Sequence, residues 1–136
     1  MKLSKEIGIT FYQNLGTLLY AIAASDRHVH KKEYEAFNEI LKNELHENVA
    51  NDYAAYAFYQ AKTSFDYYSS INADANECFN TFMKFKRSNE EMFNNKIKKL
   101  VMGAATSIAA AFSSKNKSEL IMLAKLELEL NKKFQS

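Results

Sequence analysis

Apolar side chains recur every three or four positions along most of the 136-residue chain, which is the spacing of one face of an α-helix. The pattern predicts an all-α bundle of five to six helices. The first three helices are expected over residues 4–25, 31–46 and 48–68. Their predicted inner faces are Leu3, Ile7, Phe11, Leu15, Leu18 and Ile22; Tyr34, Phe37, Leu41 and Leu45; and Ala54, Ala57, Ala61, Phe65 and Tyr68.

A short fourth helix is expected after residue 72. Asn72 or Asp74 is placed to cap it, because their side-chain oxygens accept hydrogen bonds from the free N–H groups of a first helical turn. Cys78 lies inside this helix, and a single cysteine excludes an internal disulfide. No base or orienting partner adjoins its thiol in the sequence, so we interpret Cys78 as a packing residue.

Two further helix starts are indicated by polar spacing. Ser88 with Glu91 three residues later has the pattern of a capping box and predicts the start of a long fifth helix. Asn116 and Glu119 repeat the pattern and predict a final helix. The predicted inner faces are Ile97, Leu100, Val101, Ala104, Ile108 and Ala111 in the fifth helix and Leu120, Leu123, Leu126 and Leu130 in the last.

Two segments of equal length resemble each other. Residues 22–33 (IAASDRHVHKKE) and residues 108–119 (IAAAFSSKNKSE) both begin with Ile-Ala-Ala and end on a glutamate that opens an amphipathic helix. We predict two pseudo-duplicated helical hairpins, with small alanines letting helix ends approach closely. Length and the absence of a linker predict one domain spanning residues 1–136.

Composition narrows the function classes. The chain has no proline and three glycines, as expected for helices joined by short turns, and its net charge of +2 is too small to indicate a nucleic-acid partner. No segment approaches the roughly 20 apolar residues that span a bilayer. Glu6, Gln13 and Asn14 interrupt the apolar stretch near the start, which argues against a signal peptide and predicts a cytoplasmic protein.

The turn after the first helix carries the candidate chemistry. Asp26 follows a helix C-terminus, where the helix dipole disfavours an acidic group. One compensation is an Asx turn, with Glu33 capping the next helix. The other is a divalent cation, Ca²⁺ or Mg²⁺, bound by Asp26, Glu33 and turn carbonyls. His28 and His30 add ligands suited to a transition metal, so Zn²⁺ is a third choice.

Tyrosines concentrate in the third predicted helix. Tyr53, Tyr56 and Tyr59 either line the core with their hydroxyl groups at the surface or form an exposed surface for a partner. No nucleophile elbow, HExxH motif or phosphate loop occurs in the sequence, so we expect no enzymatic activity.

The segment from Phe11 to Leu45 resembles the first hairpin of the TerB-like family, all-α domains named for a bacterial tellurite-resistance protein. The resemblance lies in Ala23-Ala24-Ser25-Asp26, Val29 and Glu33, although Arg27 stands where the family has glycine. It implies a helical fold with duplicated hairpins, possible divalent-cation binding at Asp26 and Glu33, and a role in stress response or protein assembly.

The sequence therefore predicts a non-catalytic binding or interaction module that binds a protein partner or forms a homo-oligomer. The alternative is a structural helical scaffold that self-associates through its aromatic surface and binds no ligand. Neither hypothesis includes a membrane span or a nucleic acid.

Overall fold

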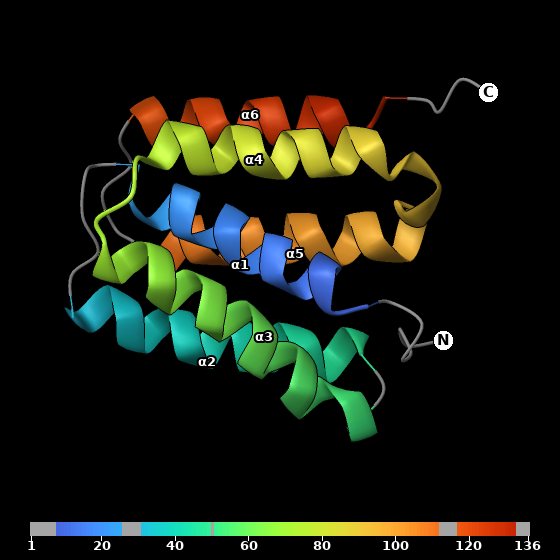
Figure 1. Ribbon diagram of the computed structural model, residues 1–136, viewed down its shortest axis with the longest axis horizontal. Helices are drawn as coiled ribbons and strands as arrows, with labels where there is room; N and C mark the ends of the chain where they lie inside the picture. The colour runs from blue at the N-terminus through green and yellow to red at the C-terminus, as the bar shows by residue number, and fades with distance from the viewer. Residues whose placement is uncertain (1–7, 26–30, 50, 112–116, 133–136) are drawn as a thin grey trace.

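Figure 1 shows the computed structural model, which describes residues 8–25, 31–49, 51–111 and 117–132, without the side chains of residues 32, 33, 51 and 52. Six α-helices fill these ranges, so the predicted all-α bundle is confirmed. The elements are α1 (Ile9–Ala23), α2 (Lys31–Asn48), α3 (Asn51–Ser70), α4 (Ala75–Ser88), the short 3₁₀ helix η1 (Glu90–Met92), α5 (Asn95–Ala111) and α6 (Lys117–Leu130).

The helices form three layers, with α1 at the centre (Figure 1). α4 and α6 lie on one side, α1 and α5 in the middle, and α2 and α3 on the other side. Every residue of α1 from Leu15 to Ala23 is buried, because α3, α4 and α5 surround this helix. Periodicity predicted one inner face for α1, whereas the structure buries nearly its whole circumference.

Close backbone packing joins α1 to α3. A Cβ atom added to Gly16 would collide with the carbonyl oxygen of Ala61, so glycine is required where these two helices cross. Just past the end of α3, the carbonyl oxygen of Ala73 accepts a hydrogen bond of 2.7 Å from the Tyr20 hydroxyl of α1. On the other side of α3, the Phe65 ring stacks on Phe37 of α2 at 3.7 Å between centroids. These contacts fix α3 on two sides.

The helix starts confirm Asp74, one of the two predicted caps of α4, and correct a second sequence prediction. Asp74, and not Asn72, caps α4, since its carboxylate accepts a 2.9 Å hydrogen bond from the Glu77 N–H. The Ser88 capping box is wrong, because α4 continues through Ser88 and η1 follows it. α5 begins seven residues later, at Asn95, and the Asn94 side chain supplies the cap by accepting from the Ile97 N–H at 3.0 Å.

The last helix faces differently from its predicted orientation. Leu126 and Leu130 are buried as expected and Leu123 is half-buried, but Leu120 is exposed. Ala111, predicted for the inner face of α5, is also exposed. The buried face of α6 consists of Glu119, Met122, Leu126, Glu129 and Leu130.

Buried apolar side chains from all six helices form one continuous core. α5 and α6 contact each other, as expected for a hairpin, while α2 packs mainly against α5 and α3. The duplicated relation of the two hairpins stays a prediction. No helix in the described ranges combines the length and the apolar character needed to cross a membrane.

Candidate interaction surface

The turn predicted to bind a cation falls at the gap between α1 and α2. Asp26, His28 and His30 lie outside the described residues, and Glu33 belongs to α2 without a described side chain. Elsewhere in the described chain, no group of three or more His, Cys, Asp and Glu side chains is placed to hold a metal ion. Cation binding at Asp26 and Glu33 therefore stays a prediction.

The tyrosines of α3 divide between the core and the surface. Tyr53 is half-buried and packs against the core, whereas Tyr56 is 40% exposed and Tyr59 is 63% exposed. Tyr67 is 58% exposed on the same helix. Because the positions 56, 59, 63 and 67 recur every three or four residues, these side chains form one stripe along α3. We call Tyr56, Tyr59, Thr63 and Tyr67 the tyrosine face.

Two rings of the tyrosine face are held by half-buried neighbours. Tyr56 makes an edge-on contact with Tyr53 at 6.0 Å between centroids, and Tyr67 makes one with Tyr68 at 5.1 Å. Tyr68 in turn lies 6.1 Å from Tyr20, whose side chain is buried. Rings fixed in this way lose less conformational freedom when a partner covers them, which favours binding.

A groove adjoins the tyrosine face where α2 and α3 meet. It has a volume of about 390 Å³ and is lined by Lys42, Asn43, His46, Ala54, Ala55 and Phe58. The ammonium group of Lys42 lies 5.4 Å from the centre of the Phe58 ring, a cation–π distance. The groove thus continues the aromatic surface around α3 toward α2.

Charges next to the tyrosine face are paired. The Tyr34 hydroxyl and the Lys62 ammonium group each donate a 2.6 Å hydrogen bond to the carboxylate of Asp66. The hydrogen bond from Lys62 to Asp66 is the main cause that raises the pKa of Lys62, with the neighbouring Tyr34 hydroxyl second, and both favour the charged form of the lysine. The positive charge of Lys62 is thus balanced by the carboxylate of Asp66.

A polar cavity of about 410 Å³ lies at the C-terminal end of α1. Ser25, Asn72 and Asn76 line it, together with Asp74, whose carboxylate caps α4. Cys78, in the first turns of α4, is buried, and burial followed by the nearby Asp74 and Glu77 charges raises its pKa to about 11. A thiol with that pKa is a poor nucleophile at neutral pH.

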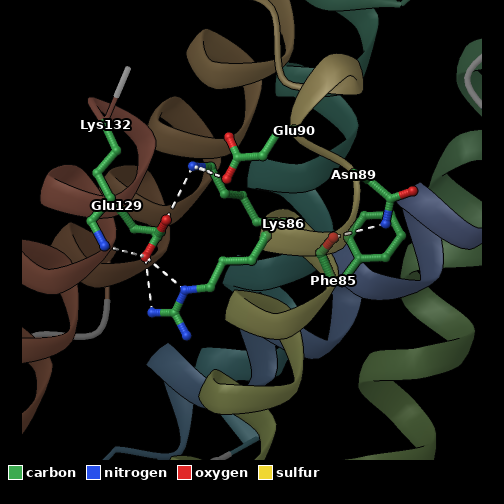
Figure 2. Close-up of polar contacts among 7 residues, drawn as sticks. Phe85, Lys86, Asn89, Glu90, Glu129 and Lys132 are labelled. Atoms are coloured by element: carbon green, nitrogen blue, oxygen red, sulfur yellow. Dashed lines mark hydrogen bonds and ion pairs between the residues drawn. The ribbon is translucent and has the colours of Figure 1, made fainter. Parts of the chain in front are cut away.

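An ion-pair cluster joins α4 to α6 in the layer opposite α2 and α3 (Figure 2). Lys86 is fully buried and donates to Glu129 at 3.1 Å and to Glu90 at 2.9 Å. Arg87 donates two hydrogen bonds to Glu129, at 3.0 and 2.9 Å, and Lys132 lies 3.4 Å from the same carboxylate. Because the cluster is closed to solvent around Lys86, we assign it a structural role in holding α6.

The electrostatics of Glu129 agree with that role. Burial alone would raise its pKa, but the hydrogen bonds from Lys86 and Arg87 outweigh burial and hold the pKa below its ordinary value. The carboxylate is therefore charged at neutral pH. Sequence periodicity missed Glu129 because a glutamate on an inner face is explained only by its partner on another helix.

Comparisons of the chain with protein-family models, with curated proteins and with solved structures return no match. The TerB-like resemblance consequently stays a prediction drawn from the first hairpin.

Proposed function

We propose that the chain is a non-catalytic protein-interaction module that binds a partner protein through the tyrosine face of α3. The observation that carries this proposal is the row of three exposed tyrosines, Tyr56, Tyr59 and Tyr67, two of which are held edge-on by their neighbours. Tyrosine is enriched at protein interfaces, since its ring supplies apolar area while its hydroxyl group stays compatible with water.

The partner's surface is expected to combine an apolar centre with hydrogen-bonding groups. The tyrosine rings would cover the centre, and their hydroxyl groups would meet polar groups at its rim. The adjoining groove, with Phe58 and two alanines, offers room for a protruding apolar side chain. This surface is more consistent with a protein than with a single-stranded nucleic acid, which requires cations along its backbone path.

The experiment compares three immobilised forms of the chain in an extract of the cells that produce it. One is the natural chain, the second carries Tyr56→Ser, Tyr59→Ser and Tyr67→Ser, and the third carries Asn80→Ala and Lys84→Ala. The last two residues are exposed on α4 and serve as the matched control. A protein retained by the natural chain and the control, but lost with the tyrosine variant, supports the proposal. Equal retention by all three forms would reject it.

Cation binding at the Asp26 to Glu33 turn, and with it a role in stress response, is a separate part of the proposal supported by the TerB-like resemblance. After treatment with a chelator, the thermal midpoint is measured with Ca²⁺, Mg²⁺, Mn²⁺ or Zn²⁺ added. An ion that binds the folded state must raise the midpoint, and Asp26→Ala or Glu33→Ala must reduce that shift. The absence of any shift at saturating ion concentration would reject this part.

A further inference from the structure

The outward side of α6 carries an aliphatic stripe that no described helix covers. Leu120, Ile121 and Leu128 are 55%, 52% and 70% exposed, and the exposed Ala124 lies between them. With about 100° of rotation per residue, the side chains at 121, 124 and 128 project from one side of the helix, and 120 lies at its margin. Aliphatic side chains gathered in this way are typical of a surface that another protein covers. We call these four residues the α6 stripe.

The ion-pair cluster fixes the direction in which this stripe points. Glu129 follows Leu128 directly and is buried against Lys86 of α4. Leu126 and Leu130 are buried on the same inner side. Rotating α6 to hide Leu128 would pull Glu129 away from its two cationic partners on α4, Lys86 and Arg87, so the exposed stripe belongs to the stable arrangement of the helix (Figure 2).

Charges of opposite sign border the two edges of the stripe. Glu127 lies along one edge of α6 and Lys125 along the other, and both are exposed. Lys132 follows the end of α6 on the lysine side; its side chain is exposed and also lies 3.4 Å from Glu129 of its own chain. When two identical helices pack side by side in parallel, each edge of one stripe meets the opposite edge of the other. A residue on the glutamate edge then faces the residue five positions further along in the partner chain. Glu127 then faces Lys132 of the second copy, two residues past the end of its α6. In an antiparallel pair the two lysine edges would meet and repel each other.

We propose that a second copy of this chain covers the α6 stripe, with the two α6 helices packed in parallel about a two-fold axis. The charge pattern commits the stripe to this occupant, because the edge of one copy complements the opposite edge of the other. Lys117 and Asn131 end the stripe, so it spans about two heptads, less than the contact area of a standard stable interface. The dimer is therefore reversible and forms with rising concentration.

A dimer formed through the α6 stripe and a dimer formed through the tyrosine face would respond oppositely to substitutions in the two surfaces. Sedimentation equilibrium over a wide concentration range should show a monomer–dimer equilibrium for the natural chain. Leu128→Glu should weaken dimerisation by about tenfold or more, since it buries a charge at the interface centre. Tyr59→Glu is the matched control, with a similar exposed fraction on α3, and should leave the equilibrium unchanged.

Circular dichroism checks the folding of both variants, and we expect both to stay folded because the substituted positions are exposed. A natural chain that is monomeric up to the millimolar range would overturn the proposal. So would a dimer that survives Leu128→Glu, or one that Tyr59→Glu dissociates.

Single cysteines test the parallel arrangement. In a parallel pair each stripe residue lies near its own counterpart, so Ile121→Cys and Leu128→Cys should each form a disulfide-linked dimer under mild oxidation. The unsubstituted chain, in which Cys78 is buried, gives the background level of disulfide cross-linking. In an antiparallel pair, counterparts at both positions cannot be close together, so failure of either variant to cross-link would reject the parallel geometry.

Discussion

The outer helices α3 and α6 lie on opposite layers of the bundle, and both expose apolar side chains, but of different chemistry (Figure 1). α3 exposes Tyr56, Tyr59 and Tyr67, whose hydroxyl groups are compatible with water. α6 exposes Leu120, Ile121 and Leu128, which gain only from being covered. The difference indicates that the tyrosine face suits a partner surface with polar groups at its rim, whereas the α6 stripe suits an aliphatic surface such as the same stripe on a second copy.

The two helices are also held in different ways. α3 is fixed by a close backbone approach at Gly16 and Ala61 and by stacking of Phe65 on Phe37. α6 is fixed by apolar contacts together with the buried pair of Lys86 and Glu129. Each surface is therefore presented by a rigid support, and each support is open to a separate test.

Breaking the support of α6 should have the largest effect. We expect Lys86→Met to lower the free energy of unfolding by about 3 kcal/mol, because it leaves the buried Glu129 short of a partner. Urea unfolding measures this loss. The matched control is Lys132→Met, which removes a pair whose lysine is exposed and should cost less than about 1 kcal/mol. Equal losses in the two variants would contradict a special role for the buried pair.

Breaking the support of α3 should cost slightly less. Gly16→Ala places a methyl group against the Ala61 backbone, and we expect a loss of about 2 kcal/mol because the helices must move apart. Gly8→Ala is the control, since a methyl group there meets no atom within 4 Å. If thermal unfolding shows Gly16→Ala to be as stable as Gly8→Ala, then α1 and α3 do not approach as described.

The pH dependence of stability distinguishes Glu129, which holds α6, from a second glutamate, Glu44. The pKa of Glu129 is lowered by folding, so its stabilising charge is fully present above the unfolded-state value, near 4.5, and is lost as the pH falls through the lower folded value. We expect Glu129→Gln to cost about 2 kcal/mol at neutral pH. That cost should shrink below pH 4.5.

Glu44, between α2 and α5, should behave in the opposite sense. Burial raises its pKa despite the hydrogen bond from Ser107, so the folded state takes up a proton there more readily than the unfolded state. Lowering the pH through the folded value should therefore stabilise the natural chain relative to Glu44→Gln. Denaturant midpoints at several pH values measure both glutamates, and parallel curves would contradict the assignment.

The smallest effects separate inner from outer tyrosines. Tyr59→Phe should change stability by less than about 0.5 kcal/mol, because the residue is exposed. Tyr20→Phe should cost about 1 kcal/mol, because it leaves the carbonyl of Ala73 without its hydrogen bond. Chemical denaturation tests the pair, and a larger loss for Tyr59→Phe would mean that the tyrosine face is part of the core.

Local periodicity predicted the helices and most of the core. Phe11, Leu15, Phe37 and Leu41, for example, are buried and recur with the spacing of one apolar helix face. It could not predict that residues 15–23 of α1 are buried on every side, which depends on three other helices. The Ser88 box failed for a similar reason. Its residues suit a helix start, but α4 runs through Ser88 and the Asn94 cap starts α5 instead.

The surfaces were partly predictable. Tyr56 and Tyr59 belonged to the partner-binding prediction, and the spacing from Tyr59 to Thr63 and Tyr67 was the available signal for the rest of the tyrosine face. The α6 stripe was not foreseen, because Leu120 has the spacing of a core residue. The pairing of Glu129 with Lys86, together with the burial of Met122, Leu126 and Leu130, sets which side of α6 turns inward, and that pairing joins residues 43 positions apart.

The most direct test of two separate surfaces places a photo-activated cross-linking amino acid at position 59 or at position 128 and determines the mass of each product in the producing cells. We predict that position 128 yields a product of two copies of this chain. Position 59 should yield a product that contains a different protein. The same product from both positions, or none from position 59, would contradict the account.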